Sequence, residues 1–86
     1  MIFTLTKTIK HGDQELTEIE LREPTAKDIR VHGLPVSSDM DVKTDVVHKY
    51  IVTLAALPPS VVDQICARDF VQLVAVVAGF FGDSGQ

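Results

Sequence analysis

Cysteine is nearly absent from this sequence, and tryptophan is absent altogether. Its 86 residues include one cysteine, one tyrosine and no tryptophan. The single cysteine, Cys66, cannot form an internal disulfide, which is typical of proteins from a reducing compartment. Cys66 lies between Ile65 and Ala67 in an apolar segment, without a neighbouring base to activate it. We therefore interpret it as a packed thiol and not as a nucleophile.

Long apolar runs and targeting segments are also missing. The longest apolar run has about a dozen residues, short of the roughly 20 that a transmembrane helix needs. The first four residues, Met-Ile-Phe-Thr, lack the basic start and apolar block of a signal peptide. We expect no membrane partner and a location in the cytoplasm.

Basic residues are few and scattered. The chain has 8 of them against 12 acidic residues, a net charge of −4, and they are spread over all parts of the sequence. Binding to a nucleic acid duplex needs clustered cations. No nucleic acid partner is therefore expected, whereas an acidic balance favours solubility.

The residues that build catalytic and metal sites are not arranged as such sites require. His11, His32 and His48 include no pair three or four residues apart, the spacing that places two imidazoles on one helix face. The sequence Gly-Asp-Ser-Gly at 82–85 resembles the start of a serine protease motif, but the chain is too short for that fold. We predict no catalytic residues, no cofactor and no enzyme activity.

Three aspartates near residue 40 faintly resemble a calcium-binding loop. They are Asp39, Asp41 and Asp45. Such a loop requires glycine at its sixth position and glutamate at its twelfth. Thr44 and Tyr50 occupy these positions here, so we interpret the aspartates as a solvated loop before a helix and predict no metal.

Alternating side chains predict a β-hairpin over residues 1–22, with a loop at 11–14. The expected inner face consists of Phe3, Leu5, Ile9, Thr17, Ile19 and Leu21. Two strands alone are barely stable in water, so this face must cover helices or another sheet. The open strand edges also offer a route to pairing between subunits.

Residues 25–82 predict about four helices. The first is short and runs from Thr25 to about His32, before Gly33 and Pro35. The second runs from about residue 42 or 44 to 57. Its buried stripe is formed by residues three and four apart, namely Val47, Tyr50, Ile51, Leu54 and Leu57.

The last two helices follow a Pro-Pro stop at 58–59. Ser60 and Asp63 have the spacing of a capping box for a short third helix. Asp69 is expected to cap a fourth helix from Phe70 to Phe81. The sequence thus predicts one α+β domain over 1–86: a two-stranded antiparallel hairpin (1–22), a helical part (25–82) whose two longer helices pack together, and a flexible tail (83–86).

The fourth predicted helix is apolar almost all round. Gln72 is its only polar side chain. One face, with Phe70, Leu73, Val74, Val77 and Phe81, suffices to line a small core. Two interpretations remain open: the hairpin and the second helix sandwich this helix, or part of it meets another protein or a second copy. The candidate partner-binding residues are Val71, Val76 and Phe80, with Phe81 at the helix end.

Residues 21–28, Leu-Arg-Glu-Pro-Thr-Ala-Lys-Asp, form the junction between hairpin and helices. Pro24 ends the strand, and Thr25 with Asp28 forms a capping box for the first helix. Together with the later segments at 54–58, 65–69 and 80–82, this stretch resembles the tail assembly chaperones of long-tailed phages, in particular the group related to the phage Mu and P2 tail proteins. The resemblance covers nearly the whole chain.

The resemblance implies a non-enzymatic function in the cytoplasm of the bacterial host. It implies a chaperone that binds the long helical tape measure protein and keeps it soluble before the tail tube polymerises around it. It also implies a longer, frameshifted form of the same protein as a companion. The alternative is a self-associating minor structural subunit of the tail, whose apolar surface is covered by further copies in a homo-oligomer.

Overall fold

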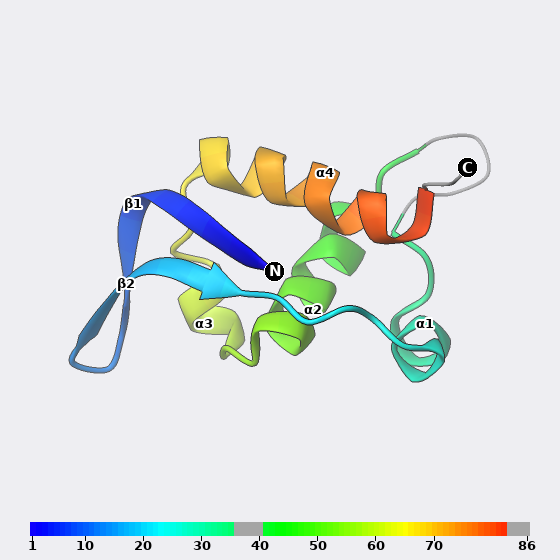
Figure 1. The fold of residues 1–86 in the computed structure, drawn as a ribbon, viewed down its shortest axis with the longest axis horizontal. Coiled ribbons are helices and arrows are strands. Elements are labelled where there is room, and N and C mark those ends of the chain that lie inside the picture. The colour runs from blue at the N-terminus through cyan, green and yellow to red at the C-terminus, as the bar shows by residue number, and fades with distance from the viewer. Residues whose placement is uncertain (36–40, 83–86) are drawn as a thin grey trace.

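The computed structural model describes residues 1–35 and 41–82, and these have the predicted α+β architecture (Figure 1). Two strands, β1 (Ile2–His11) and β2 (Gln14–Glu20), come first. Four helices follow: α1 (Ala26–His32), α2 (Thr44–Ala55), α3 (Pro59–Val62) and α4 (Ala67–Gly82). The prediction of a hairpin followed by about four helices is confirmed. The predicted tail, most of the loop at 34–41 and most of the Gly-Asp-Ser-Gly sequence lie outside the described residues.

Helix α2 is the central element. It packs against α1, α3, α4 and β2. Figure 1 shows α2 passing obliquely through the middle of the molecule, with α4 along the top, the hairpin at the left and α1 at the right. The predicted packing of the two longer helices, α2 and α4, is confirmed.

The hairpin turns through Gly12 and Asp13, between the paired residues His11 and Gln14. Gly12 has φ +67°, the left-handed region that glycine adopts without a steric cost. Farther along, β1 advances five residues between its pairs Thr4–Glu18 and Ile9–Leu16, while β2 advances two. The extra residues in β1 bulge out of the ladder, which frees their backbone groups for other partners.

The same irregularity changes which β2 side chains face inward. Leu16 is half-buried and Ile19 is buried, although they are three residues apart. Thr17, which strict alternation placed on the inner face, is exposed. That part of the sequence prediction was wrong, because the alternation of two holds only while a strand stays regular.

A cluster of buried apolar side chains joins the hairpin to the helices. Its members are Phe3, Leu5, Ile9, Ile19, Leu21, Val47, Tyr50, Ile51, Leu54, Val61, Val62, Ile65, Leu73 and Val77. The predicted inner residues of the hairpin, Thr17 apart, and four of the five residues of the α2 stripe are among them. Leu57, the fifth, follows α2 and is half-buried against the cluster.

The starts of the last two helices differ from prediction. Helix α3 begins with Pro59, and Pro58 takes the cap position expected for Ser60, because proline is well suited to the first turn of a helix. Helix α4 begins at Ala67, three residues before Phe70. Asp69 therefore lies in its first turn and does not cap it; its carboxylate bonds to β1 instead.

Candidate functional site

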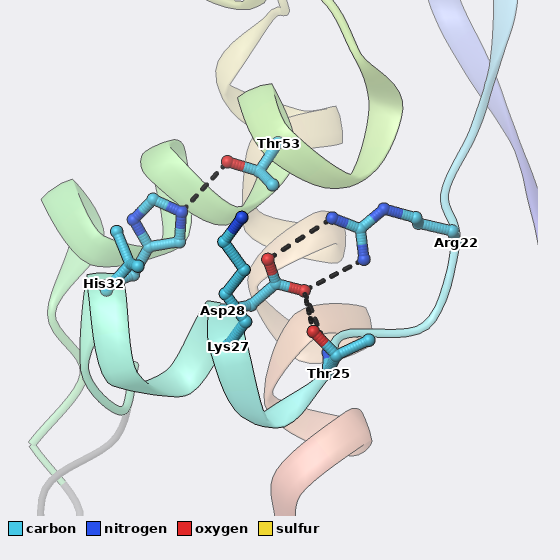
Figure 2. Close-up of a pocket in the computed structure, with 7 residues that line it drawn as sticks. Arg22, Thr25, Lys27, Asp28, His32 and Thr53 are labelled. Carbon is cyan, nitrogen blue, oxygen red and sulfur yellow. Dashed lines mark hydrogen bonds and ion pairs between the residues drawn. The ribbon is translucent and has the colours of Figure 1, made fainter.

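The junction at 21–28 joins the hairpin to two helices through hydrogen bonds of its own. Leu21 is buried, and the backbone N–H of Arg22 donates to the carbonyl of Leu54, at the end of α2, over 3.2 Å. The Arg22 guanidinium turns the other way, to Asp28 in α1 (Figure 2). One residue thus connects the end of β2 with both α1 and α2.

Asp28 is the centre of these contacts. Its carboxylate lies 2.9 Å and 3.3 Å from the two terminal nitrogens of Arg22, and it accepts the Thr25 backbone N–H over 2.8 Å. The capping box predicted for Thr25 and Asp28 is confirmed. The hydrogen bonds from Arg22 and Thr25 hold the pKa of Asp28 well below its ordinary value, although burial opposes this. Asp28 therefore remains an ionised, buried anchor.

Tyr50 fixes α1 against α2 from the other side. Its hydroxyl donates to the carbonyl of Gly33 over 2.6 Å and approaches that of Asp28 at 3.3 Å. Its ring meets those of His32 and Phe81 edge-to-face, each at 5.2 Å between centroids. Burial, and then the negative charge of Asp28, raise the pKa of Tyr50. The neutral phenol can therefore serve as a permanent donor.

A pocket of about 520 Å³ opens beside this junction. Its lining is Arg22, Thr25, Lys27, Asp28, Val31, His32 and Thr53 (Figure 2). Most of its polar groups already pair with one another: Arg22 with Asp28, Asp28 with Thr25, and His32 Nε2 with Thr53 Oγ1 at 3.0 Å. We interpret the pocket as the solvent-facing side of the structural contact between residues 21–28 and the helices α1 and α2.

The other residues singled out in the sequence lie apart. His11 is exposed at the hairpin turn, and His48 Nε2 lies 2.9 Å from Asp63 Oδ1. Cys66 is half-buried, with its sulfur 3.7 Å from Thr6 Oγ1. Within residues 1–35 and 41–82, no three acidic, histidine or cysteine side chains gather as a metal site would require. Asp39 is outside this part of the chain.

The four candidate binding residues of α4 do not share one exposed face. Val71 is 67% exposed. Val76, Phe80 and Phe81 are half-buried and pack against the core cluster, Phe81 through its contact with Tyr50. The fully buried apolar side chains of α4 are Leu73 and Val77. Val71 is therefore freely accessible to solvent, and the other three side chains are accessible only in part.

A second group of exposed apolar side chains was not found from the sequence. Ile29, Val31, Leu34 and Val42 are 38%, 58%, 53% and 41% exposed. The backbone N–H of Lys43 donates to the carbonyl of Pro35 over 2.8 Å, which holds the segment of Val42 beside that of Leu34. We call these four residues the α1-end surface; Ile29 and Val31 are two positions apart on α1, so their side chains point to different sides of the helix. A helix of seven residues buries only one narrow stripe, and in α1 Asp28 occupies that stripe. The shortness of the predicted helix was the signal in the sequence that its apolar residues would remain exposed.

Comparison of the sequence with known protein families identifies the family of the chain. Residues 2–82 match the family model described as "Phage tail assembly chaperone proteins, E, or 41 or 14". The chain belongs to this family. The match spans nearly the whole sequence and confirms the family resemblance of residues 21–28. No curated protein and no solved structure matches this chaperone.

Within residues 1–35 and 41–82, no helix of the chaperone combines the length and the apolarity that crossing a membrane requires. Helix α4 packs against α2, and its Leu73 and Val77 are buried in the core cluster.

Proposed function

We propose that this tail assembly chaperone acts without catalysis, in the cytoplasm of the bacterial host, by binding the tape measure protein and keeping it soluble until the tail tube forms. The family membership supports the tail-assembly context. The observation that supports a binding function is the α1-end surface. Its four apolar side chains remain exposed to water although a domain of this size has a small core and gains from burying apolar surface.

The proposed contact has two parts. One is the α1-end surface, and the other is Val71 on α4, with the partly covered Val76, Phe80 and Phe81 as secondary contacts. A long helical protein with apolar faces aggregates unless those faces are covered, and grooves or patches of apolar side chains bind such helices. The chaperone would cover them segment by segment.

The strength of such a contact suits temporary binding. Each large apolar side chain that leaves water contributes about 1.5–3 kcal/mol when its burial is complete. Part of this is offset by the entropy lost on association. A few anchors on two separate surfaces therefore give a modest affinity, from which competing tail tube subunits can release the partner.

Co-expression with a tape measure fragment tests the proposal. The fragment is expected to stay in the soluble fraction and to co-purify with the chaperone. Val31→Glu and Val71→Glu should each reduce co-purification, because a charge replaces an exposed apolar contact. Gln72→Glu, next to Val71 and also exposed, is the matched control. A fragment that stays insoluble beside a folded chaperone contradicts the proposal.

The alternative function is a minor structural subunit of the tail that associates with itself. In that case copies of the chain cover the α1-end surface, and a homo-oligomer forms without any partner. Mass measurement in solution separates the two: a stable closed oligomer that no longer binds apolar dyes favours the subunit. A longer, frameshifted form of the chain remains part of the proposal, and it would carry the same α1-end surface.

A further inference from the structure

The two edges of the hairpin differ in whether their backbone groups are occupied. Along β1, the side-chain amide of Gln64 imitates a neighbouring strand: its Oε1 accepts the Lys10 N–H over 2.8 Å and its Nε2 donates to the Lys10 carbonyl over 2.7 Å. Asp69 accepts the N–H of Thr6, in the bulged part of β1, over 2.9 Å. Side chains therefore close the outer edge of β1 at Thr6 and Lys10, whereas no described residue bonds that edge at Ile2 and Thr4, the partners of Glu20 and Glu18.

The outer edge of β2 is open. Met1 and Leu21 exchange two backbone hydrogen bonds, of 2.9 Å and 2.7 Å. In an antiparallel ladder the residues next to such a pair direct their N–H and C=O groups to the opposite side. Glu20 and Glu18, at alternate positions, thus point these groups away from β1, and no hydrogen bond from any described residue reaches them.

From this asymmetry we propose that the β2 edge binds an extended segment of another protein, rich in lysine or arginine, as a third strand of the sheet. Backbone hydrogen bonds would give the affinity of such strand addition. The side chains of Glu15, Glu18 and Glu20 are all exposed along β2 and set the preference for a basic segment. This binding mode deepens the proposed function and rests on it for the nature of the partner.

A second copy of the chain fits this edge poorly. Two β2 edges pairing with each other would place glutamates against glutamates, and like charges opposite one another destabilise a sheet. Pairing of β2 with the part of β1 between Thr6 and Lys10 in another copy would require Asp69 and Gln64 to leave that edge, so only the short stretch at Ile2 and Thr4 is accessible. A basic strand from a different protein meets neither obstacle.

The surface beyond the end of β2 offers room for the segment to continue. A hollow of about 300 Å³ lies there, lined by Glu20, Arg22, Thr53, Leu54, Ala55 and Ala56. It adjoins Glu20, so a chain paired with the β2 edge runs directly towards it. Apolar atoms of Leu54 and the two alanines can receive one side chain of the bound segment.

Amide-resolved hydrogen exchange of the full chain tests the inference with a ten-residue peptide of alternating lysine and valine. On binding, the Glu18 and Glu20 amides should exchange at least several-fold more slowly, while the Ile19 amide, already paired with β1, should change little. Two N-methylated peptides, one methylated at every lysine and the other at every valine, serve as controls. One should bind and the other should not, because only alternate amides of a strand face its neighbour. Protection elsewhere, equal binding of both methylated peptides, or no binding of the parent peptide overturns the inference.

A variant pair separates backbone pairing from charge. Glu18→Pro removes an N–H that the hairpin does not use, so it should fold like Glu18→Ala but lose the peptide. Glu18→Ala should bind with a modest loss and a weaker dependence on salt. If Glu18→Pro does not fold, the methylated peptides decide. If a tape measure fragment co-purifies equally well with both folded variants, binding at the β2 edge is overturned and the proposed function stays intact. If the fragment binds no form of the chaperone, only the proposed function is contradicted.

Discussion

The carboxylate of Asp69 accepts both the backbone N–H and the hydroxyl of Thr6, over 2.9 Å and 3.0 Å. These residues are 63 positions apart, and Asp69 is completely buried. The contact joins the first turn of α4 to the bulged part of β1. It uses a backbone N–H that the irregular ladder leaves free, so the bulge and the buried carboxylate explain each other.

Replacing Asp69 should loosen this joint. In Asp69→Asn the amide can accept one of the two Thr6 bonds but places a donor beside the other, so the melting temperature should fall by several degrees and the Thr6 amide should exchange faster. Thr6→Ala removes only the hydroxyl and should cost less. Thermal unfolding and hydrogen exchange check both. An Asp69→Asn protein as stable as the wild type, with a protected Thr6 amide, would contradict the assigned role.

Stability should fall in acid because of Asp28 and Asp69. The pKa of each is below its ordinary value of 3.8, for Asp28 through Arg22 and for Asp69 because hydrogen bonds led by that from the Thr6 backbone outweigh burial. Folding therefore favours the ionised forms. Their contribution is complete at neutral pH and is lost as pH drops below about 4 towards the lowered values. Melting curves from about pH 7 to pH 2.5 should show a flatter acid limb in Asp28→Asn and Asp69→Asn.

The parts of the fold that the sequence predicted correctly depend on local rules. The α2 stripe follows helical spacing, and the junction at 25–28 is a capping box that four consecutive residues define. The role of Asp69 could not be predicted in this way. An aspartate before an apolar run is typical of a helix cap, but its actual partner, Thr6, is distant in sequence and available only because β1 bulges.

The candidate binding residues show a second limit. A helix that is apolar all round does not indicate which side faces the core. The contact of Phe81 with Tyr50 and the burial of Leu73 settle the orientation of α4, and neither follows from periodicity. The α1-end surface was missed for a different reason, because four apolar residues in a short helix and its flanking segments form no periodic pattern.

Truncating Leu73 and truncating Val71, both on α4, should change the free energy of unfolding by very different amounts. Leu73 is completely buried, so Leu73→Ala should reduce the free energy of unfolding by about 2–5 kcal/mol, a large part of the total for a small domain. Val71 is 67% exposed, so Val71→Ala should stay within about 0.5 kcal/mol of the wild type. Urea unfolding of the two variants measures this directly. Equal losses would mean that α4 packs by another face.

Tyr50→Phe isolates the hydrogen bond that joins α2 to the end of α1. The substitution keeps the ring contacts with His32 and Phe81 but leaves the Gly33 carbonyl without its 2.6 Å donor. The expected loss is about 1–3 kcal/mol, since a partly buried acceptor is left unpaired. Hydrogen exchange should show the opening concentrated in α1. A uniform change over the whole chain would instead assign Tyr50 to global packing.

Gln64 should keep the β1 edge from pairing with other chains. Gln64→Ala frees the N–H and C=O of Lys10, so the Lys10 amide should exchange faster. At each protein concentration, the variant should also self-associate more than the wild type does. The basic side chains of Lys7 and Lys10 would then meet the glutamates of β2 in a second copy. Gln64→Glu keeps the acceptor for the Lys10 N–H and loses only the donor, so its effect should be intermediate. Sedimentation over a range of concentrations and amide exchange measure both. An unchanged Lys10 amide in Gln64→Ala would show that the edge is closed by something other than this side chain.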